Sequence, residues 1–354
     1  MTDTPLPLHG IRVLDLSTYV PGPYASMLLA DFGAEVIAVE PPGGDPARSL
    51  PARIGGDSAL HSWLGRGKSS LRLDLKVTED IERLRALAVD ADVFIEGFTP
   101  GVAARLGVDA VTLRALNPRL VYCSISGEGP RGTAAPGHDI NYTARSGLSS
   151  QLVDNTGVPV PSGALVADMS AGLHATVGVL VALLERVRSG EGQEVDVSLL
   201  GGAVAFAGPQ MVKAIAGDRP ERSVDLNLGG DPAYGVYRTR DDRFVALGSL
   251  EEKFWTRLCA VLDVPHLHDR RASEPTAVRT ELERIIAGRT RDEWSEILEP
   301  AGVCFSPVND LEDALADPLL THAGLIGRNP SGHAVIRNPI ALSRTPADDS
   351  RPAP

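Results

Sequence analysis

Short apolar runs alternate with segments of helical periodicity through the first part of the chain. Buried strands are predicted where apolar residues run together or alternate with polar ones, at residues 11–17, 35–40, 71–75, 92–96 and 120–125. Helices are predicted where apolar residues recur every three or four positions, at residues 24–32, 78–88 and 100–106. Strands that alternate with helices form parallel sheets covered on both faces. We therefore expect an α/β domain that is doubly wound, mainly parallel and Rossmann-like.

The rest of the chain starts with long apolar helices and then changes in character. Helices are predicted over 168–189, with Leu173, Val177, Leu180 and Leu184 on one stripe, and over 199–215, with a strand at 194–198 between them. Residues 218–230 are polar and Gly-rich, which is typical of a linker. Further on we expect a hairpin formed by 234–238 and 243–248, helices at 251–262, 279–287 and 291–299, and a strand at 334–336.

These patterns predict two domains in one chain. The predicted parts are a large domain over residues 1–200, a linker over 201–228, a smaller α+β domain over 229–315 and a C-terminal segment over 316–354 that returns to the large domain.

Composition and charge indicate which classes of protein the chain can belong to. The chain has 354 residues, 43% hydrophobic and 23% charged, which is the balance of an ordinary globular protein. The net charge is -12 and no run of Lys or Arg occurs, so we expect no nucleic-acid partner. The longest apolar run, near residues 175–184, is too short to span a bilayer, so we expect no membrane partner.

The cysteines indicate the compartment. Cys123, Cys259 and Cys304 are widely spaced and offer neither a disulfide framework nor a metal site. The chain also begins without the basic and apolar regions of a signal peptide. We therefore expect a cytoplasmic protein without a bound metal.

The first strand–helix–strand unit invites comparison with dinucleotide-binding folds, with Glu40 as the ribose-binding acid. The connecting loop argues against it, because residues 19–23 do not form G-x-G-x-x-G and two prolines remove backbone N–H groups. The long loop 41–67 contains Arg48, Arg53 and Arg66. It is either a solvated surface loop or a source of contacts to an anion.

Two groups that can move protons lie close together in the middle of the chain. His138 and Asp139 are followed, thirty positions after His138, by Asp168 at the start of the long apolar helix. Removing a proton beside a thioester carbonyl needs a base and a stabilised enolate oxygen. Asp168 suits the first task if burial raises its pKa, and N–H groups at the helix start suit the second. His138 can give or take the other proton because its intrinsic pKa is near neutral.

Other interpretations of these residues stay open at this point. Two bases on opposite faces of one carbon give racemisation, whereas attack by Asp168 on the thioester would give acyl transfer. His138 can equally be a structural histidine, and Asp168 a helix N-cap. Asp139 can orient His138 or cap a turn.

At these residues the sequence resembles the family of class III coenzyme A transferases and α-methylacyl-CoA racemases (the CaiB/BaiF type), over nearly the whole chain. The motifs that carry the resemblance are residues 8–16, 21–37, 43–48, 66–76, 93–101, 105–107, 124–127 and 137–142. The resemblance implies a doubly wound large domain, a small domain and an interlocked homodimer. Its active site would lie between the large domain of one subunit and the small domain of the other.

The resemblance also implies roles for individual residues. Gly137-His138-Asp139 is similar to the racemase branch, because transferases usually have Tyr where His138 stands. This implies His138 and Asp168 as the two acid/base groups. Glu251 matches the glutamate that partners the histidine in racemases and that comes from the second subunit.

The coenzyme A site of the family implies a further set of contacts, with coenzyme A as part of the substrate and no separate cofactor. The residues implied are Tyr19, Val20, Arg48, Leu73, Gly97, Phe98, Arg105, Gly137 and Asp139, with Arg48 for a phosphate. The sequence departs from the family pattern at two places that bear on these contacts. Pro41-Pro42 stand where the family often has Arg or Lys, and residues 128–131 replace the usual aromatic residue and Gln.

The expected activity is inversion of the α-carbon of 2-methylacyl-CoA thioesters, in fatty acid metabolism. The rival is a class III coenzyme A transferase with Asp168 as nucleophile. A non-catalytic coenzyme A-binding module is a weaker third interpretation.

Overall fold

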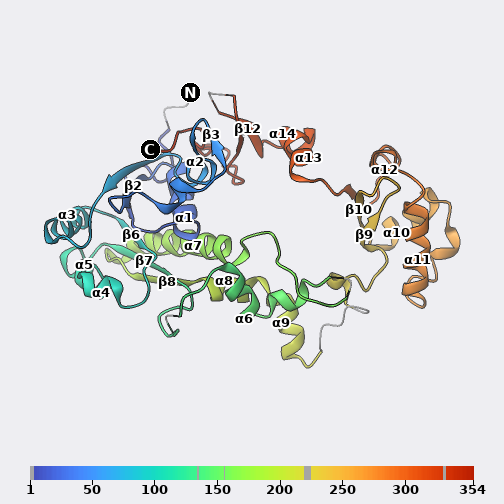
Figure 1. Ribbon diagram of the computed structural model, residues 1–354, viewed down its shortest axis with the longest axis horizontal. Helices are drawn as coiled ribbons and strands as arrows, with labels where there is room; N and C mark the ends of the chain where they lie inside the picture. The colour runs from blue at the N-terminus through green and yellow to red at the C-terminus, as the bar shows by residue number, and fades with distance from the viewer. Residues whose placement is uncertain (1–3, 134, 155, 219–224, 330–331) are drawn as a thin grey trace. The chain divides into compact units, whose positions relative to one another are not determined.

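The computed structural model describes residues 4–133, 135–154, 156–218, 225–329 and 332–354. These residues divide into two compact units, shown with their element labels in Figure 1. Unit 1 is formed by residues 1–208 together with 318–354, and unit 2 by residues 209–317. The boundary at 208 falls inside the predicted linker of 201–228, of which residues 219–224 lie outside the described residues.

Within the described residues, unit 1 contains a six-stranded sheet in which every neighbouring pair is parallel. The strands are β1 (Arg12–Asp15), β2 (Glu35–Glu40), β5 (Lys68–Arg72), β6 (Val93–Glu96), β7 (Val121–Ser126) and β8 (Glu194–Ser198). Their order across the sheet is β5-β2-β1-β6-β7-β8. A small hairpin, β3 (Arg53–Ile54) with β4 (Asp57–Ser58), lies in the loop after β2.

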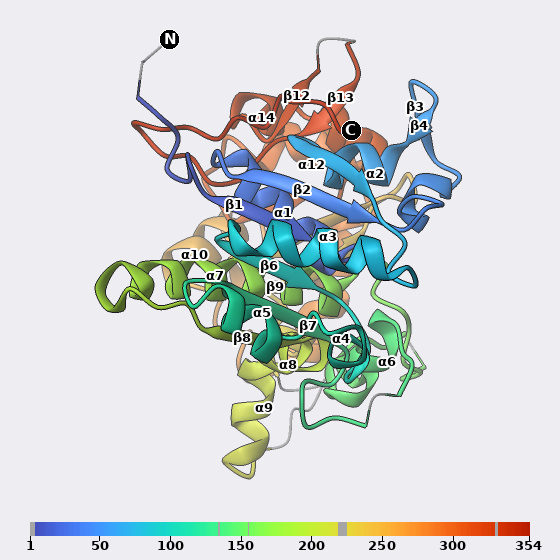
Figure 2. The ribbon, with the colours of Figure 1, turned by 90° about the vertical axis from the view of Figure 1, so that its left-hand side faces the viewer.

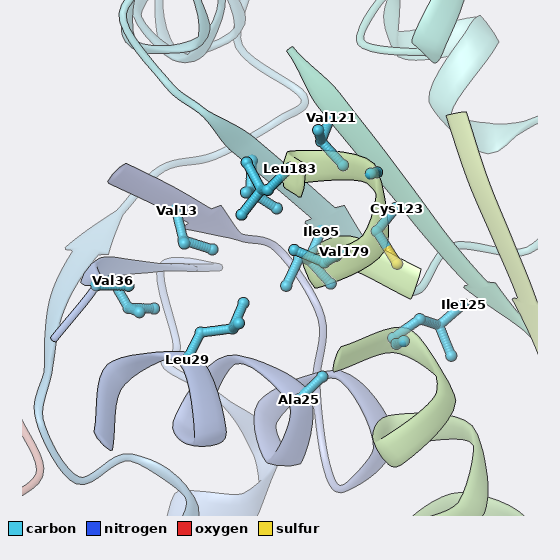
Figure 3. Close-up of a cluster of buried hydrophobic side chains, with 14 of the residues drawn as sticks. Val13, Ala25, Leu29, Val36, Ile95, Val121, Cys123, Ile125, Val179 and Leu183 are labelled. Atoms are coloured by element: carbon cyan, nitrogen blue, oxygen red, sulfur yellow. The ribbon is translucent and has the colours of Figure 1, made fainter. Parts of the chain in front are cut away.

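Helices cover both faces of this sheet. They are α1 (Pro21–Asp31), α2 (Ala59–Leu64), α3 (Thr78–Val89), α4 (Val102–Leu106), α5 (Ala110–Leu116), α6 (Asp139–Arg145), α7 (Val166–Ser189) and α8 (Leu199–Phe206), with 3-10 turns η1 (Pro46–Ser49) and η2 (Leu148–Gln151). Side chains of α1 and α7 pack on one face, where Leu29 and Val179 meet Val13 and Ile95 (Figure 3). Helices α3, α4 and α5 lie on the other face (Figure 2), and their buried side chains, such as Leu84, Ala103 and Leu113, pack in its core. The predicted doubly wound α/β fold is confirmed.

The strand order fixes where a ligand site can form. From β1 the chain adds β2 and β5 on one side, and from β6 it adds β7 and β8 on the other. The loops that leave the carboxyl ends of β1 and β6 therefore diverge and leave a crevice between them. These loops carry residues 16–20 and 97–101.

Helix α7 buries the face that periodicity did not single out. Ala171, Ala175, Val179 and Ala182 are buried against the sheet, whereas Leu173, Val177, Leu180 and Leu184 are exposed. Among the described residues α7 is the one helix long and apolar enough to cross a membrane by length and composition, and half of that stretch is buried inside the unit. A core helix passes the same test.

Several sequence-predicted elements have different bounds, and two of these differences have a local physical cause. The helix predicted over 199–215 is two helices, α8 and α9 (Gly208–Ile215), because Pro209 has no N–H to continue the first helix. The strand predicted at 71–75 is β5 at Lys68–Arg72, which pairs with residues 36–40 of β2. Asp74 starts a turn by accepting a hydrogen bond from the N–H of Val77, and this ends the strand early.

Unit 2 is built on a separate core. Its elements after α9 are η3 (Leu226–Leu228), β9 (Tyr234–Arg238), β10 (Phe244–Gly248), α10 (Glu252–Val261), η4 (Pro265–Leu267), α11 (Pro275–Ile286), α12 (Arg291–Leu298), β11 (Phe305–Pro307) and α13 (Leu311–Ala316). Within the described residues β9, β10 and β11 form an antiparallel sheet, so the predicted hairpin is confirmed. Trp255 and Trp294 are buried between this sheet and the helices.

The C-terminal segment belongs to unit 1. It contains α14 (Pro318–His322) and the predicted strand β13 (Ala334–Ile336), which pairs with β12 (Ile326–Arg328). Arg66 forms two hydrogen bonds to the buried Asp31 carboxylate, of 2.9 and 2.7 Å, and one to the carbonyl of Ile336. Asn338 donates to the same carboxylate. Arg66 is therefore paired with an internal carboxylate.

Candidate active site

A cavity of about 1160 Å³ opens at the crevice between the β1 and β6 loops of unit 1. Its wall is formed by the loops after β1, β6 and β7, the start of α6 and the segment before α7. Eight of the residues predicted from the sequence line it: Tyr19, Val20, Gly97, Phe98, Gly137, His138, Asp139 and Asp168. The structure thus brings together segments that are separated by up to 149 positions in the chain, Tyr19 to Asp168.

The β1–α1 loop forms one wall of the cavity, and its backbone conformation is sterically constrained. Tyr19 has a φ of 63°, a left-handed conformation that is uncommon for a residue with a side chain, and it is 50% exposed. Val20 is buried between α1 and α2, so it presents mainly backbone to the cavity. Gly22 allows Ser17 to pack closely, because a Cβ at Gly22 would lie 2.0 Å from the Ser17 Oγ.

The loop after β6 is held by a buried carboxylate. Glu96 accepts a hydrogen bond of 2.6 Å from the Phe98 N–H and another of 2.6 Å from the Ser124 hydroxyl of β7. Burial raises the pKa of Glu96, and the two hydrogen bonds oppose the rise. This arrangement fixes the Gly97-Phe98 wall to the end of the sheet.

His138 is the N-cap residue of α6 and is exposed at the cavity. Its backbone N–H donates to the Asn141 Oδ1 at 2.9 Å, and its carbonyl accepts from the Asn141 N–H. These bonds fix the backbone from which the imidazole projects. The imidazole itself is therefore positioned by the first turn of α6.

Asp139 lines the cavity, but its carboxylate is bonded to the start of α7. Its buried carboxylate accepts hydrogen bonds from the N–H groups of Ala167 at 2.6 Å and Asp168 at 3.1 Å. It therefore caps the start of α7 from α6, rather than a turn of its own segment. The expectation that these helix-start N–H groups are free for an enolate oxygen is wrong, because Asp139 already occupies two of them.

Asp168 lies in the first turn of α7, three positions after the N-cap residue Leu165. The interpretation of Asp168 as the N-cap is thus wrong. Burial raises the pKa of Asp168 to about 6, and the nearby Asp139 carboxylate adds to the rise, while His138 opposes it. Asp168 is consequently ionised at neutral pH yet close to the range in which an imidazole titrates.

Four predicted residues are not among those that line this cavity. Arg48 donates to both oxygens of Glu40, at 2.6 and 2.8 Å, so a phosphate contact would compete with this ion pair. The Leu73 side chain is buried in the core under α3. Arg105 is exposed on α4. Glu251 is exposed in unit 2 as the N-cap residue of α10. The roles of these four residues stay predictions.

Glu128 and Tyr142 are among the polar residues of the wall to which sequence reasoning gave no role. Tyr142 follows His138 by four positions, which places both on one face of a helix. That spacing is the signal that would have identified Tyr142, but α6 was not predicted. Glu128 accepts hydrogen bonds from the N–H and hydroxyl of Thr133, which lower its pKa.

The cavity wall carries carboxylates that no basic side chain of the wall balances. Among the described residues that line it, the ionisable carboxylates are Glu128, Asp139 and Asp168, and no Lys or Arg is present. The segment before α7 adds an apolar rim, from Leu152, Val160 and Leu165. No group of three or more His, Cys, Asp or Glu suited to a metal ion occurs in the part of the chain that the structure describes.

Comparison with known proteins gives a consistent family over the whole chain. Residues 8–354 match the family described as CoA-transferase family III. An α-methylacyl-CoA racemase of Mus musculus is 35% identical over 87% of this chain and 79% of its own length. A succinate–glutarate CoA-transferase of Agrobacterium fabrum is also 35% identical, over 100% of this chain and 94% of its own length. The crystal structure of a CAIB/BAIF family protein from Brucella suis, 28% identical, covers 99% of this chain and 96% of its own with a TM-score of 0.87.

Proposed function

Because the chain belongs to CoA-transferase family III, we propose that it is an acyl-CoA racemase that inverts the α-carbon of 2-methylacyl-CoA thioesters. Coenzyme A enters as part of the substrate. The observation that carries the proposal is that an imidazole, His138, and a carboxylate with a pKa of about 6, Asp168, line one cavity. A carboxylate whose pKa is raised to about 6 suits a reaction in which it must both take and return a proton near neutral pH.

In the proposed reaction one proton leaves one face of the α-carbon and another is added to the opposite face. In one direction, ionised Asp168 removes the α-proton, and the electron pair of the C–H bond moves into the thioester to form an enolate. His138, protonated, then gives a proton to the opposite face, and the enolate collapses to the other epimer. In the reverse direction the two groups exchange roles, as microscopic reversibility requires.

The cation-free wall favours an uncharged acyl group. A dicarboxylic acyl chain, such as glutaryl, would bring a second carboxylate among Glu128, Asp139 and Asp168, without a Lys or Arg on the described wall to pair with it. Repulsion between like charges in a partly desolvated cavity opposes such binding. The apolar rim of Leu152, Val160 and Leu165 instead suits a branched hydrocarbon chain.

A class III coenzyme A transferase is the second candidate, because the Agrobacterium fabrum transferase matches the full chain at the same identity as the racemase. In that reaction the Asp168 carboxylate attacks the thioester carbonyl. The C–S bond breaks, coenzyme A leaves as a thiolate, and an acyl–aspartyl anhydride remains. The thiolate then attacks the aspartyl carbonyl, which releases the donor acid and leaves an aspartyl–coenzyme A thioester. The acceptor carboxylate attacks this thioester to form a new anhydride and expel the thiolate, which attacks the carbonyl of the acceptor to give the new acyl-CoA and restore Asp168.

Deuterium exchange separates the two activities. The protein is incubated in deuterated water with a single epimer of a 2-methylacyl-CoA and no acceptor acid. A racemase incorporates deuterium at the α-carbon while optical activity is lost, and His138→Ala or Asp168→Ala abolishes epimer inversion. Absence of exchange, together with an acyl group on Asp168 that hydroxylamine releases, would instead establish the transferase.

We also propose that the protein acts as a homodimer in which Glu251 of the partner chain completes the site. The exposed apolar stripe of α7 supports association, because Leu173, Val177 and Leu184 lie adjacent on its surface. The family resemblance supports the role of Glu251, which holds the orientation of the His138 imidazole in this proposal.

A further inference from the structure

Tyr142 lies on α6 one turn after His138, and it is 6% exposed. Its ring packs against Ala167 at the start of α7 and Ala203 of α8. It nevertheless lines the cavity that contains His138 and Asp168. The ring is therefore fixed by three helices, and its orientation relative to both acid/base groups is set by the fold.

The hydroxyl of Tyr142 occupies a slot between two glycines of the cavity wall. A Cβ at Gly127 would lie 2.1 Å from the Tyr142 Oη, and a Cβ at Gly137 would lie 2.8 Å from it. Contacts this short are forbidden, so any other residue at Gly127 would displace the hydroxyl. The two loops thus approach Tyr142 closely because both positions lack a side chain.

This hydroxyl has no hydrogen-bond partner among the described residues, and it is not one of the buried polar atoms sealed from solvent. A buried tyrosine normally pairs its O–H with a protein acceptor. Here the ring is buried but the oxygen meets the cavity, so the missing partner is a group that enters the cavity.

The Tyr142 hydroxyl keeps its proton at neutral pH. Burial raises its pKa, and the nearby Glu128 and Asp168 carboxylates raise it further. It can therefore donate a hydrogen bond but is a poor general base. This property matters because two N–H groups of α7 that would suit an oxyanion are occupied by Asp139.

We propose that Tyr142 is a further catalytic residue whose O–H donates to the thioester oxygen as negative charge develops there. The inference rests on the proposed racemase function. The α-proton moves to Asp168 or His138, the electron pair of the C–H bond moves toward oxygen, and the tyrosine proton stays on Oη throughout. The hydrogen bond strengthens from the thioester to the enolate, so it lowers the barrier more than it tightens substrate binding.

The test compares Tyr142→Phe with the wild-type protein in the deuterium-exchange assay. Loss of one oxyanion donor should reduce kcat for exchange by about 100- to 1000-fold with little change in KM, since the donor acts mainly in the transition state. Tyr122→Phe is the matched control, because Tyr122 is equally buried but packs on Phe94 away from the cavity wall. It should retain wild-type exchange.

A second pair of measurements separates catalysis from packing. An S-alkyl coenzyme A, which lacks the carbonyl, should bind Tyr142→Phe and the wild type equally. Gly127→Ala keeps the hydroxyl but displaces it, and it should lose exchange in the same way. Together these results would support the proposal.

Three outcomes would overturn it. Unchanged exchange by Tyr142→Phe removes the catalytic role and leaves the racemase proposal intact. Equal loss of exchange and of S-alkyl coenzyme A binding would make Tyr142 a packing residue only. Absence of exchange in the wild type would instead defeat the racemase proposal on which the inference rests.

Discussion

The pKa of Asp168 suits the role of base that we propose for it. Most exposed aspartates titrate near pH 4, where they are too weak as bases to take an α-proton. In this protein burial, with a second carboxylate on the neighbouring helix, raises the pKa to about 6. Sequence reasoning made the role of Asp168 conditional on such a rise, and the contribution of Asp139 became evident only when α6 was seen to cap α7.

The pH dependence follows from this pKa. For the epimer whose proton Asp168 removes, kcat/KM should rise about eightfold between pH 5 and pH 6.5, because only the ionised carboxylate is a base, and should fall again at higher pH, because this direction also needs His138 protonated. The change in optical rotation measured from each pure epimer across this range would check it. Asp168→Glu should keep a rising limb, whereas a flat profile for both epimers would contradict a role for Asp168 as base.

Arg48 forms an ion pair with Glu40, and sequence reasoning did not identify this partner. Burial opposes ionisation of Glu40, but hydrogen bonds from Arg48, the Asp45 N–H and Ser70 outweigh it and lower its pKa to about 2. A folded-state pKa below the unfolded value means that Glu40 stabilises the fold above about pH 4.5, and that this stability is lost as the pH falls toward 2.

We therefore predict that Arg48→Gln acts mainly on stability. It leaves a buried carboxylate without its ion pair and should lower the free energy of unfolding by about 2 kcal/mol at pH 7, with less loss at pH 3. Chemical denaturation at both values measures this. Arg105→Gln is the comparison, because Arg105 is exposed and should leave stability unchanged. A large rise in KM for Arg48→Gln at unchanged stability would favour the phosphate role instead.

At the scale of elements, strands and long helices were predictable because their signal is local. The apolar runs at β1, β2, β6 and β7 are buried on both faces, and so they stand out in the sequence. Bounds were less predictable where a neighbour decides them, as for β5, whose extent is set by pairing with β2. The short helix α6 was missed because seven residues carry too little periodicity.

The exposed stripe of α7 shows that apolar periodicity does not by itself identify the buried face of a helix. Periodicity marks Leu173, Val177, Leu180 and Leu184, yet the buried face is formed by small residues such as Ala171 and Ala175. Small side chains allow α7 to approach the sheet and α1 closely, so size rather than hydrophobicity selects the inner face. A pattern of apolar residues alone does not distinguish a core face from a face that is apolar for another purpose.

The link between α6 and α7 also explains how much of the site was predictable. His138 and Asp168 were identified by residue type and family resemblance, and both line the cavity. The hydrogen bonds of Asp139 to Ala167 and Asp168 join residues 28 and 29 positions apart, and no local pattern encodes such a contact.

Two substitutions at Asp139 should separate its charge from its cap. Asp139→Asn keeps an oxygen for the N–H groups of α7 but removes the negative charge, so the pKa of Asp168 should fall and the acid limb of the pH profile should move to lower pH. Asp139→Ala removes the cap as well and should lower the free energy of unfolding by about 1–2 kcal/mol. An unchanged limb in Asp139→Asn would show that burial alone sets the pKa of Asp168.

At the scale of the whole molecule, unit 1 holds a cavity with two acid/base groups, and unit 2 holds Glu251 on a separate core. The chain leaves unit 1 after residue 208 and returns to it at residue 318. The C-terminal segment is then held by Asp31, Arg66 and Asn338, which form a buried hydrogen-bonded group. Such an order of segments permits exchange of unit 2 between subunits, as the proposed dimer requires.

Mixing two inactive variants tests whether the proposed site is shared. His138→Ala and Glu251→Ala chains, each inactive alone, are co-expressed with different tags. If His138 of one chain works with Glu251 of the other, each mixed dimer contains one intact and one doubly altered site. Random pairing makes half of the dimers mixed, so about a quarter of wild-type exchange activity should return. Dimers purified through both tags should show about half. If His138 and Glu251 of the same chain work together, every site in the mixed dimer lacks one group, and purified mixed dimers would stay inactive.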